Sequence, residues 1–167
     1  IRADSVAYFT KPLNISKLVD KIDSLMSIDS EKPFHVILID DDPSLLTYYS
    51  TVLEHAGMVV KTINNPSEII TLLHNFPVDL IITDVYMNEC NGMELSQIIR
   101  QFDSFIFTPI MYLSTEQDIK VQLMALQQGA DDFLVKPVET WHLISAITSR
   151  IQRSRLLISF MVRDSLT

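Results

Sequence analysis

The sequence predicts an α/β fold in which a parallel sheet of five strands is covered by helices on both faces and the last helix is extended. From residue 35 onward, short runs rich in apolar and β-branched residues alternate five times with segments whose apolar residues recur at helical spacing. The connections are short, and a regular strand-helix alternation of this kind forms a parallel sheet with buried strands. With 167 residues, 47% of them hydrophobic, the chain can bury one core of domain size.

Turn and capping residues bound the elements in the first half of this region. Asp42-Pro43 is typical of a helix start, with Asp42 as a cap rather than a metal ligand. Gly57 is typical of a helix end, and Asn64-Asn65-Pro66 of a turn. These signals predict strands at 35–40 and 58–63 and helices at 44–56 and 67–74.

The second half continues the alternation. An apolar run at 79–83 leads into a loop at Asp84, and Gly129 ends a helical pattern before the last strand. The predicted strands here are 79–83, 109–113 and 132–135, and the predicted helices are 92–100 and 116–128.

The last helix is longer than the domain needs. Residues 139–163 contain no Gly or Pro, which predicts a helix of about 25 residues, or roughly 37 Å. The spacings of three and four that mark a coiled-coil seam connect Ile144, Ile147, Ile151, Ser154, Ile158 and Met161. We therefore expect a homodimer through this helix. The alternative is a helix that lies on its own domain, and the polar Ser154 with the arginines near it favours that alternative.

The first residues of the chain repeat the end of the main domain. At one constant offset, Tyr8-Phe9-Thr10-Lys11-Pro12 matches Phe133-Leu134-Val135-Lys136-Pro137, and Leu18 and Ile22 match Leu143 and Ile147. A repeat at about one domain length indicates two copies of one domain. We expect residues 1–28 to be the last strand and helix of a preceding copy, 29–34 a linker, 35–153 the main domain, and 154–167 an extension of the last helix toward an output domain.

The composition argues against two classes of partner. The net charge is −8 and no cluster of Lys and Arg is visible, which argues against a nucleic-acid surface. No run of 18 apolar residues exists, so no membrane span is predicted. The single cysteine, Cys90, leaves no disulfide framework, and we expect a cytoplasmic location.

Acidic residues follow two of the predicted strands. Asp40 and Asp41 come after the first strand and Asp84 after the third, and parallel strands bring these ends to one edge of the sheet. Close carboxylates raise one another's pKa unless a cation neutralises them. Oxygen ligands without His or Cys select a hard ion such as Mg²⁺. We predict a Mg²⁺ site formed by Asp40, Asp41, Asp84 and the backbone carbonyl of Tyr86.

A carboxylate beside Mg²⁺ is suited to phosphoryl transfer. We expect Asp84 to act as a nucleophile that forms an aspartyl phosphate, while the metal and Lys136 neutralise charge on the phosphoryl oxygens. Ser114, at the end of the fourth strand, is placed to donate a hydrogen bond to the third oxygen. The bond before Pro137 is predicted to be cis, which would direct Lys136 across the edge of the sheet.

At these residues the chain resembles the receiver domain of bacterial two-component response regulators, over about residues 35–153. That family carries an acidic pair, a phosphorylated aspartate, a Ser or Thr, and a Lys followed by a cis-Pro, in this order at strand ends. The matching residues are Asp40, Asp41, Asp84, Ser114, Lys136 and Pro137, together with Gly92 and the turn Gly129-Ala130-Asp131-Asp132. Five matches in order form a specific signal.

The resemblance implies a flavodoxin-like fold, Mg²⁺ dependence, and a phosphoryl group received from a sensor histidine kinase or a phosphotransfer protein. It also implies a switch in which Ser114 moves toward the phosphoryl group and Phe133 turns inward. Three positions depart from the family pattern: Asn88 replaces a usual Pro, Phe133 replaces a commoner Tyr, and Tyr86 is bulky. We expect Tyr86, two residues past Asp84, to hinder attacking water and slow the loss of the phosphoryl group.

The end of the chain carries a second resemblance. Arg163-Asp164-Ser165-Leu166-Thr167 is similar to the opening of a diguanylate cyclase domain, which begins Asp-x-Leu-Thr. The resemblance implies an output domain that makes cyclic di-GMP, preceded by two receivers.

Two other functions stay open from the residues. Asp40-x-Asp42 after a strand, with the acidic turn at 129–132, fits a haloacid-dehalogenase-type phosphatase in which Asp40 is the nucleophile; Asp84 and Lys136 would then have no task. The other is a degenerate receiver that only docks a partner. Its usual signature is loss of the acidic pair, the aspartate or the lysine, and this sequence keeps all of them.

Overall fold

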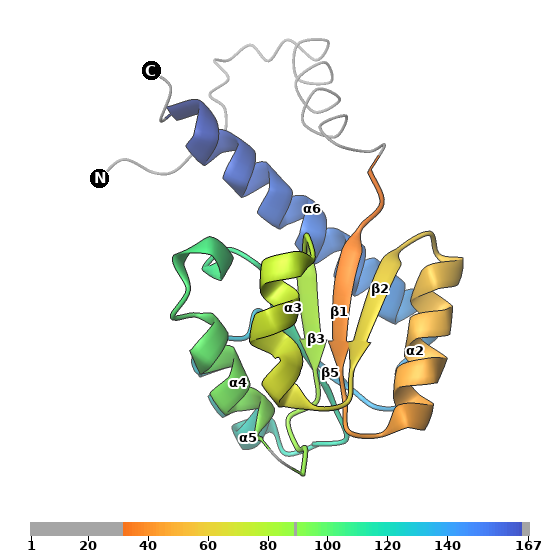
Figure 1. Cartoon of the computed structure of the whole chain (residues 1–167). Helices are drawn as coiled ribbons and strands as arrows, with labels where there is room; N and C mark the ends of the chain where they lie inside the picture. The colour runs from red at the N-terminus through yellow and green to blue at the C-terminus, as the bar shows by residue number, and fades with distance from the viewer. Residues whose placement is uncertain (1–31, 89, 165–167) are drawn as a thin grey trace, which may run out of the picture. The chain divides into compact units, whose positions relative to one another are not determined.

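The structure, a computed structural model, describes residues 32–88 and 90–164 (Figure 1). The strand and helix expected within residues 1–28, residues 29–31 of the expected linker, and residues 165–167 lie outside the described residues.

The predicted strands form one parallel sheet in the order β2-β1-β3-β4-β5. The strands are β1 (His35–Ile39), β2 (Val59–Ile63), β3 (Leu80–Thr83), β4 (Ile110–Ser114) and β5 (Asp132–Val135). Every residue of β3 and β4 is buried, as expected for strands with helices on both faces. The register pairs Ile39 with Thr83 and Ser114 with Val135, so the residues that follow these strands emerge at one edge.

The helices alternate with the strands as predicted, and the α/β fold class is confirmed. They are α2 (Pro43–His55), α3 (Ile69–Asn75), α4 (Gly92–Ile99), α5 (Ile119–Gln127) and α6 (Thr140–Asp164). Two short 3₁₀ turns precede α3 and β4: η1 (Pro66–Glu68), which falls at the start of the predicted helix 67–74, and η2 (Asp103–Phe105), which was not predicted.

The helices form two layers on opposite faces of the sheet. Alternate residues of β1 show this division, because Val36 and Leu38 pack with α2 and α6, whereas Ile37 and Ile39 pack with α3 and α4. The smaller cluster under α5 contains Tyr112 from β4 and Ala125. Figure 1 shows α6 behind the sheet, on the side away from α3 and α4.

Capping residues explain where two helices begin. The Asp42 carboxylate accepts hydrogen bonds from the backbone N–H groups of Ser44 and Leu45, at 2.8 and 3.4 Å, so Asp42 is the cap of α2 as predicted. Helix α5 begins at residue 119, later than the predicted 116, because the Asp118 side chain caps the backbone N–H of Lys120. The correction leaves Glu116 in the loop between β4 and α5.

Helix α6 packs on its own domain over its first half. Leu143, Ile147 and Ile151 are buried in the core with exposed fractions of 1%, 0% and 0%. Ile147 and Ile151 belong to the predicted seam, so the expectation that the whole seam faces a second chain is wrong for these positions. The apolar periodicity of this part of the helix comes from packing on the sheet.

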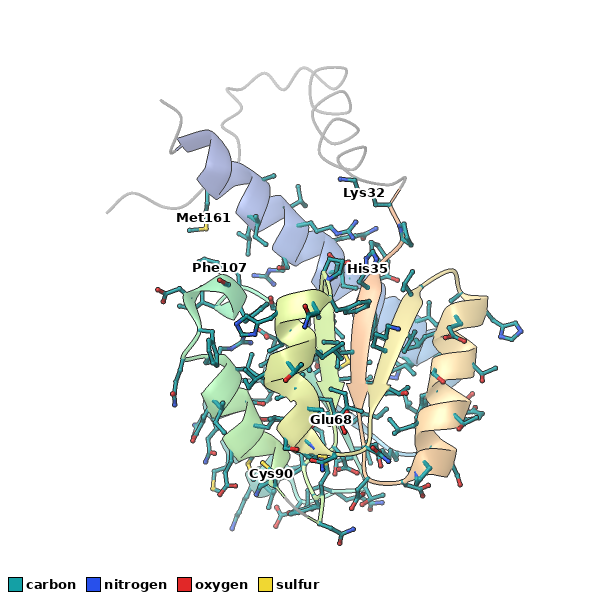
Figure 2. All side chains as sticks on the ribbon, in the orientation of Figure 1. Lys32, His35, Glu68, Cys90, Phe107 and Met161 are labelled. Atoms are coloured by element: carbon teal, nitrogen blue, oxygen red, sulfur yellow. The ribbon has the colours of Figure 1, made fainter. Side chains whose placement is uncertain are left out.

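Polar contacts continue along α6 past its buried half. Arg150 pairs with Asp132 (Nε to Oδ2, 3.0 Å), and the Ser154 hydroxyl donates to the carbonyl of Phe107 (2.8 Å). Arg155 binds both carboxylate oxygens of Asp79, at 3.0 and 2.7 Å. The helix then projects beyond the amino ends of the strands, where Figure 2 shows Phe107 and Met161. None of the helices in the described part of the chain combines the length and apolar character that crossing a membrane requires.

Candidate functional site

The carboxyl ends of four neighbouring strands supply the polar residues of the site. Asp40 follows β1, Asp84 follows β3, Ser114 ends β4 and Lys136 follows β5. The backbone N–H of Asp84 donates to the Ile39 carbonyl at 3.0 Å, and that of Lys136 donates to the Ser114 carbonyl at 2.8 Å. The strand pairing therefore continues up to the site residues and sets their positions.

Lys136 joins the ends of β1 and β3. Its ammonium lies 2.5 Å from Asp40 Oδ2 and 2.7 Å from Asp84 Oδ2. The three residues are buried, with exposed fractions of 7%, 5% and 9% for Lys136, Asp40 and Asp84. Two carboxylates are thus held beside one cation in a space from which most water is excluded.

The second oxygen of each buried carboxylate accepts a backbone hydrogen bond. Asp40 Oδ1 accepts from the N–H of Asp42 at 2.9 Å, and Asp84 Oδ1 accepts from the N–H of Tyr86 at 3.2 Å. These bonds fix the orientation of both side chains at the strand ends.

The charge of Lys136 is maintained by its two partners. Burial alone would lower the pKa of the Lys136 ammonium, because it disfavours the charged form. The hydrogen bonds to Asp40 and Asp84, together with the charges of these carboxylates, raise the pKa above its ordinary value. Lys136 is therefore charged at neutral pH.

Ser114 has a buried hydroxyl with no partner. Its exposed fraction is 0%, and it is the one buried side-chain polar group among the described residues that makes no hydrogen bond. An unsatisfied buried hydroxyl costs about 1–3 kcal/mol, so most native structures avoid it. A ligand oxygen at this edge of the sheet would remove the cost.

The peptide bond between Lys136 and Pro137 is cis, as predicted. Gly92, the first residue of α4, allows a close approach to the site. A Cβ at this position would lie 1.9 Å from the carbonyl oxygen of Asp84, so any side chain there would displace the loop after β3. Gly92 thus lets the start of α4 pack against the backbone of the central aspartate.

Asp41 is separated from the other two carboxylates. Its Oδ2 accepts hydrogen bonds from both the backbone N–H (3.0 Å) and the side-chain amide (2.6 Å) of Asn88, in the loop between β3 and α4. No three Asp, Glu, His or Cys side chains in the described ranges are arranged to hold a metal ion. The predicted Mg²⁺ ligands Asp40, Asp41, Asp84 and the Tyr86 carbonyl therefore stay a prediction.

Tyr86 connects two loops beside the site. Its side chain is 51% exposed, and its hydroxyl donates to Glu116 Oε2 at 2.7 Å. Hydrogen bonds from the Asp118 backbone and from Tyr86 lower the pKa of Glu116, whereas the bond to Glu116 raises the pKa of the Tyr86 phenol. Sequence reasoning assigned Glu116 to a helix and missed this contact; the capping pattern at Asp118 is the signal that could have found it.

Phe133, the predicted switch residue, is half-buried at the α5 side of the sheet. Its ring meets the edge of the Tyr112 ring at a centroid distance of 6.0 Å. Tyr112 is fully buried, and its hydroxyl donates to Ser96 Oγ at 2.9 Å, which in turn donates to the carbonyl of Gly92 at 2.9 Å. A chain of contacts therefore leads from Phe133 to the residue that packs against Asp84.

Apart from Asp40, the acidic residues that a phosphatase would need are engaged in other contacts. Asp42 caps α2. Asp131 binds Arg100 at 2.8 Å, and Asp132 begins β5 and binds Arg150. Since Asp132 lies at the amino end of its strand, the acidic turn is at the opposite edge of the sheet from Asp40.

The family model described as the response regulator receiver domain matches residues 36–148. The chain belongs to this family, which is a family of signalling domains, and its fold is the flavodoxin-like fold of CheY-type receivers.

Similar curated proteins are longer than this chain. A 76.5 kDa protein of Thiocystis violacea is 31% identical over 94% of the chain, and the protein RcaC of Microchaete diplosiphon is 32% identical over 93%. The transcriptional regulatory protein GlrR of Escherichia coli is 35% identical over 75% of the chain. The chain spans 23%, 24% and 28% of the lengths of these relatives.

Solved structures of receivers match the same region. The chemotaxis response regulator CheY4 of Vibrio cholerae superposes with a TM-score of 0.67 and 28% identity, covering 71% of this chain and 99% of CheY4. A response regulator receiver domain from Clostridium thermocellum gives 0.68 and 28%, covering 74% and 98%. Both are similar to this chain over nearly their whole length.

Proposed function

We propose that this receiver accepts a phosphoryl group on Asp84 and relays the resulting change to an output domain. The observation that carries the proposal is the unpartnered, fully buried hydroxyl of Ser114 at the edge where Lys136 meets Asp40 and Asp84. Transfer of a phosphoryl group requires a carboxylate that accepts it, a cation that neutralises its charge and a hydrogen-bond donor for its oxygens. Asp84, Lys136 and Ser114 would supply these groups.

In the proposed reaction a carboxylate oxygen of Asp84 attacks the phosphorus of a phosphohistidine on a sensor histidine kinase or a phosphotransfer protein. The bond from phosphorus to the imidazole nitrogen breaks, the imidazole leaves with the electron pair, and an acyl phosphate forms on Asp84. Lys136 neutralises charge on the phosphoryl oxygens, and Ser114 donates its hydroxyl hydrogen to one of them.

Asp40, Asp41, Asp84 and the backbone carbonyl of Tyr86 would hold a Mg²⁺ ion. The donor set fits a hard cation, because it contains only oxygen atoms, and Asp40 and Asp84 already lie beside one positive charge. When bound, the ion would supply charge neutralisation at the phosphoryl oxygens. Asp41 would have to leave Asn88 in order to take part.

The relay would run through Ser114 and Phe133. Movement of Ser114 toward the phosphoryl group would leave space near β4, and Phe133 would turn inward beside Tyr112. Phe133 has no hydroxyl, so its effect on a partner would come from its exposed area alone.

The proposal also includes the domains before and after this receiver. The alignments with the Thiocystis and Microchaete proteins cover 157 and 155 residues, more than the stretch 36–167 contains, so the similarity extends before residue 36. This supports a tandem arrangement in which residues 1–28 are the last strand and helix of a preceding receiver. We also propose a diguanylate cyclase as the output domain, because residues 163–167 resemble the start of one. The single cysteine, Cys90, supports a cytoplasmic location.

The extended part of α6 would form a homodimer contact. Beyond Arg155 it exposes Leu157 (48%), Ile158 (43%) and Met161 (51%). Two of the arginines near the seam, Arg150 and Arg155, are bound to Asp132 and Asp79 of their own domain, so their charges are partly neutralised. Output domains joined to these helices would then be brought together in pairs.

Phosphorylation by a small donor tests the proposal. The wild type, Asp84→Asn and Asp42→Asn are incubated with acetyl phosphate and Mg²⁺ and studied by intact-mass and peptide mass spectrometry. We expect one phosphoryl group on the wild type and on Asp42→Asn, mapped to Asp84, and none on Asp84→Asn. Modification of Asp40 would favour the haloacid-dehalogenase-type phosphatase. The absence of any modification would favour a degenerate receiver that only docks a partner.

A further inference from the structure

Asn88 stands where this family usually has a proline, and it binds Asp41 through two donors. The backbone N–H and the side-chain amide both reach Asp41 Oδ2, at 3.0 and 2.6 Å. A proline at this position would have neither donor, because it lacks the N–H and has no amide side chain. The double contact is therefore a property of this chain and its particular loop.

The contact holds Asp41 apart from the other carboxylates. Asp40 and Asp84 turn toward Lys136, whereas Asp41 turns toward the loop between β3 and α4. The consequence is that no three carboxylates converge in the described part of the chain. Asp41, Asn88 and Tyr86 instead line an open pocket of about 280 Å³ on the loop side of the site.

The same loop is fixed at a second point. Tyr86 binds Glu116 in the loop between β4 and α5, and Asn88 binds Asp41 in the loop between β1 and α2. The segment from Tyr86 to Asn88 thus connects the two loops that flank it. A change in either contact would alter the position of this segment.

We propose that Asn88 acts as a latch that competes with Mg²⁺ for Asp41. Both Asn88 donors hold Asp41 Oδ2 toward their own loop and not toward a cation shared with Asp40 and Asp84. Metal binding therefore breaks the latch and frees the segment from Tyr86 to Asn88. The latch weakens Mg²⁺ binding and links metal occupancy to the position of this loop. The inference rests on the proposed phosphoryl-acceptor function, whose metal site it regulates.

Removing the donors stepwise tests the latch. The Mg²⁺ dissociation constant is measured by isothermal titration calorimetry for the wild type, Asn88→Ala and Asn88→Pro, without any phosphoryl donor. A hydrogen bond to an exposed carboxylate contributes little net free energy, because water can replace the donor. We therefore expect the loss of the side-chain donor in Asn88→Ala to tighten Mg²⁺ binding only about three- to tenfold. Asn88→Pro, which loses both donors, should bind Mg²⁺ at least as tightly as Asn88→Ala. Asn75→Ala is the matched control, because Asn75 is exposed at the far end of α3, and its affinity should equal that of the wild type.

Amide resonances give a second readout. In a Mg²⁺ titration followed by ¹H–¹⁵N correlation spectra, the backbone and side-chain amide signals of Asn88 should move toward solvent-exposed values at the same Mg²⁺ concentrations that shift Asp40 and Asp84. Amides of Asn88 that stay hydrogen-bonded in the Mg²⁺-saturated protein would overturn the latch.

The outcomes separate the two proposals. If the wild type binds Mg²⁺ and Asn88→Ala binds equally or more weakly, Asn88 does not compete for Asp41, and only the latch is wrong. If neither the wild type nor the variants bind Mg²⁺, the metal part of the proposed function fails and the latch fails with it.

Discussion

Among the single residues of the site, Lys136 is the cation that offsets part of the negative charge. One ammonium faces two buried carboxylates, so the triad carries one net negative charge before any ligand binds. A cation can therefore enter without displacing Lys136, and a phosphoryl group on Asp84 would meet Lys136 already in place. The unpartnered Ser114 hydroxyl adds a neutral donor at the same edge.

Replacing Tyr86 should shorten the lifetime of the phosphoryl group. The Tyr86 side chain lies two residues past Asp84 and is held by Glu116 in the neighbouring loop, so we expect the ring to hinder a water molecule that attacks the phosphoryl group. We expect Tyr86→Asn to lose its phosphoryl group several-fold faster than the wild type, measured as release of inorganic phosphate after removal of acetyl phosphate. Tyr86→Phe keeps the ring and loses the bond to Glu116, and its rate should lie between the two.

A Tyr86→Asn protein that dephosphorylates no faster than the wild type would show that the ring does not limit access of water. If Tyr86→Phe equals Tyr86→Asn, the bond to Glu116 matters and the bulk of the ring does not.

Strand-end residues could be predicted from the sequence, and loop contacts could not. Asp84 and Lys136 each follow a strand directly, so the register of the sheet fixes where they emerge. The contacts of Asn88 with Asp41 and of Tyr86 with Glu116 join residues 47 and 30 positions apart across loops. No periodicity relates such residues, because loop conformation decides which of them meet.

At the scale of elements, α6 shows why apolar spacing alone is ambiguous. A helix that packs on a sheet and a helix in a coiled coil both repeat apolar residues at three and four positions. The sequence therefore predicted the bounds of this helix closely and misassigned its first half, in which Ile147 and Ile151 are completely buried in the domain. The polar residues near the seam were the better guide, since Ser154 and Arg155 bind the domain's own loops.

Arg155 should anchor α6 where the helix leaves the domain. It binds both oxygens of Asp79, whose Oδ2 also accepts from the His35 N–H at 2.8 Å, and its guanidinium lies 4.9 Å from the centre of the Phe34 ring. Because the pair is largely buried, removing one partner leaves the other charge uncompensated. We expect Arg155→Ala to lower the free energy of unfolding by about 2–4 kcal/mol in urea denaturation.

Arg153→Ala is the control for Arg155→Ala, because Arg153 lies on the exposed side of the same helix. It should change the free energy of unfolding by less than about 0.5 kcal/mol. Equal effects of the two substitutions would mean that helix propensity or net charge, and not the contact with Asp79, explains the loss.

At the scale of the whole molecule, stability should fall on the alkaline side. Burial raises the pKa of the Tyr112 and Tyr49 phenols, and the carboxylate partners raise the pKa of Lys136. All three groups bind their protons more tightly in the folded chain, so their contribution is complete below the unfolded pKa values near 10 and is lost as the pH rises through the folded values.

Tyr112→Phe tests this pH dependence, because phenylalanine cannot ionise. Between about pH 9 and 11 the urea midpoint of Tyr112→Phe should fall less steeply than that of the wild type. At pH 7 the free energy of unfolding of the variant should be lower by about 1 kcal/mol, because the hydrogen bond to Ser96 is lost. Tyr48→Phe, at a 53% exposed position, should follow the wild-type curve. Parallel curves for all three proteins would contradict the role of Tyr112.

Self-association of the whole chain depends on which apolar surface meets a second copy. Two of the exposed apolar surfaces in the described part of the chain carry three large side chains each: Leu157, Ile158 and Met161 on the extended part of α6, and Ile119 (69%), Leu123 (56%) and Met124 (51%) on α5. The α6 surface continues from a helix whose first half is fixed to the domain, so pairing there would cost little additional ordering of the chain. We therefore expect the dimer contact on α6.

A charge placed on each surface in turn distinguishes them. Ile158→Glu should shift the monomer-dimer equilibrium toward the monomer by at least about tenfold in sedimentation equilibrium, because dimerisation would bury an unpaired carboxylate from each chain. Leu123→Glu makes the same change on α5 and should leave the equilibrium unchanged. Dissociation caused by Leu123→Glu and not by Ile158→Glu would assign the contact to α5. The extended part of α6 would then be left to connect the receiver with the proposed output domain.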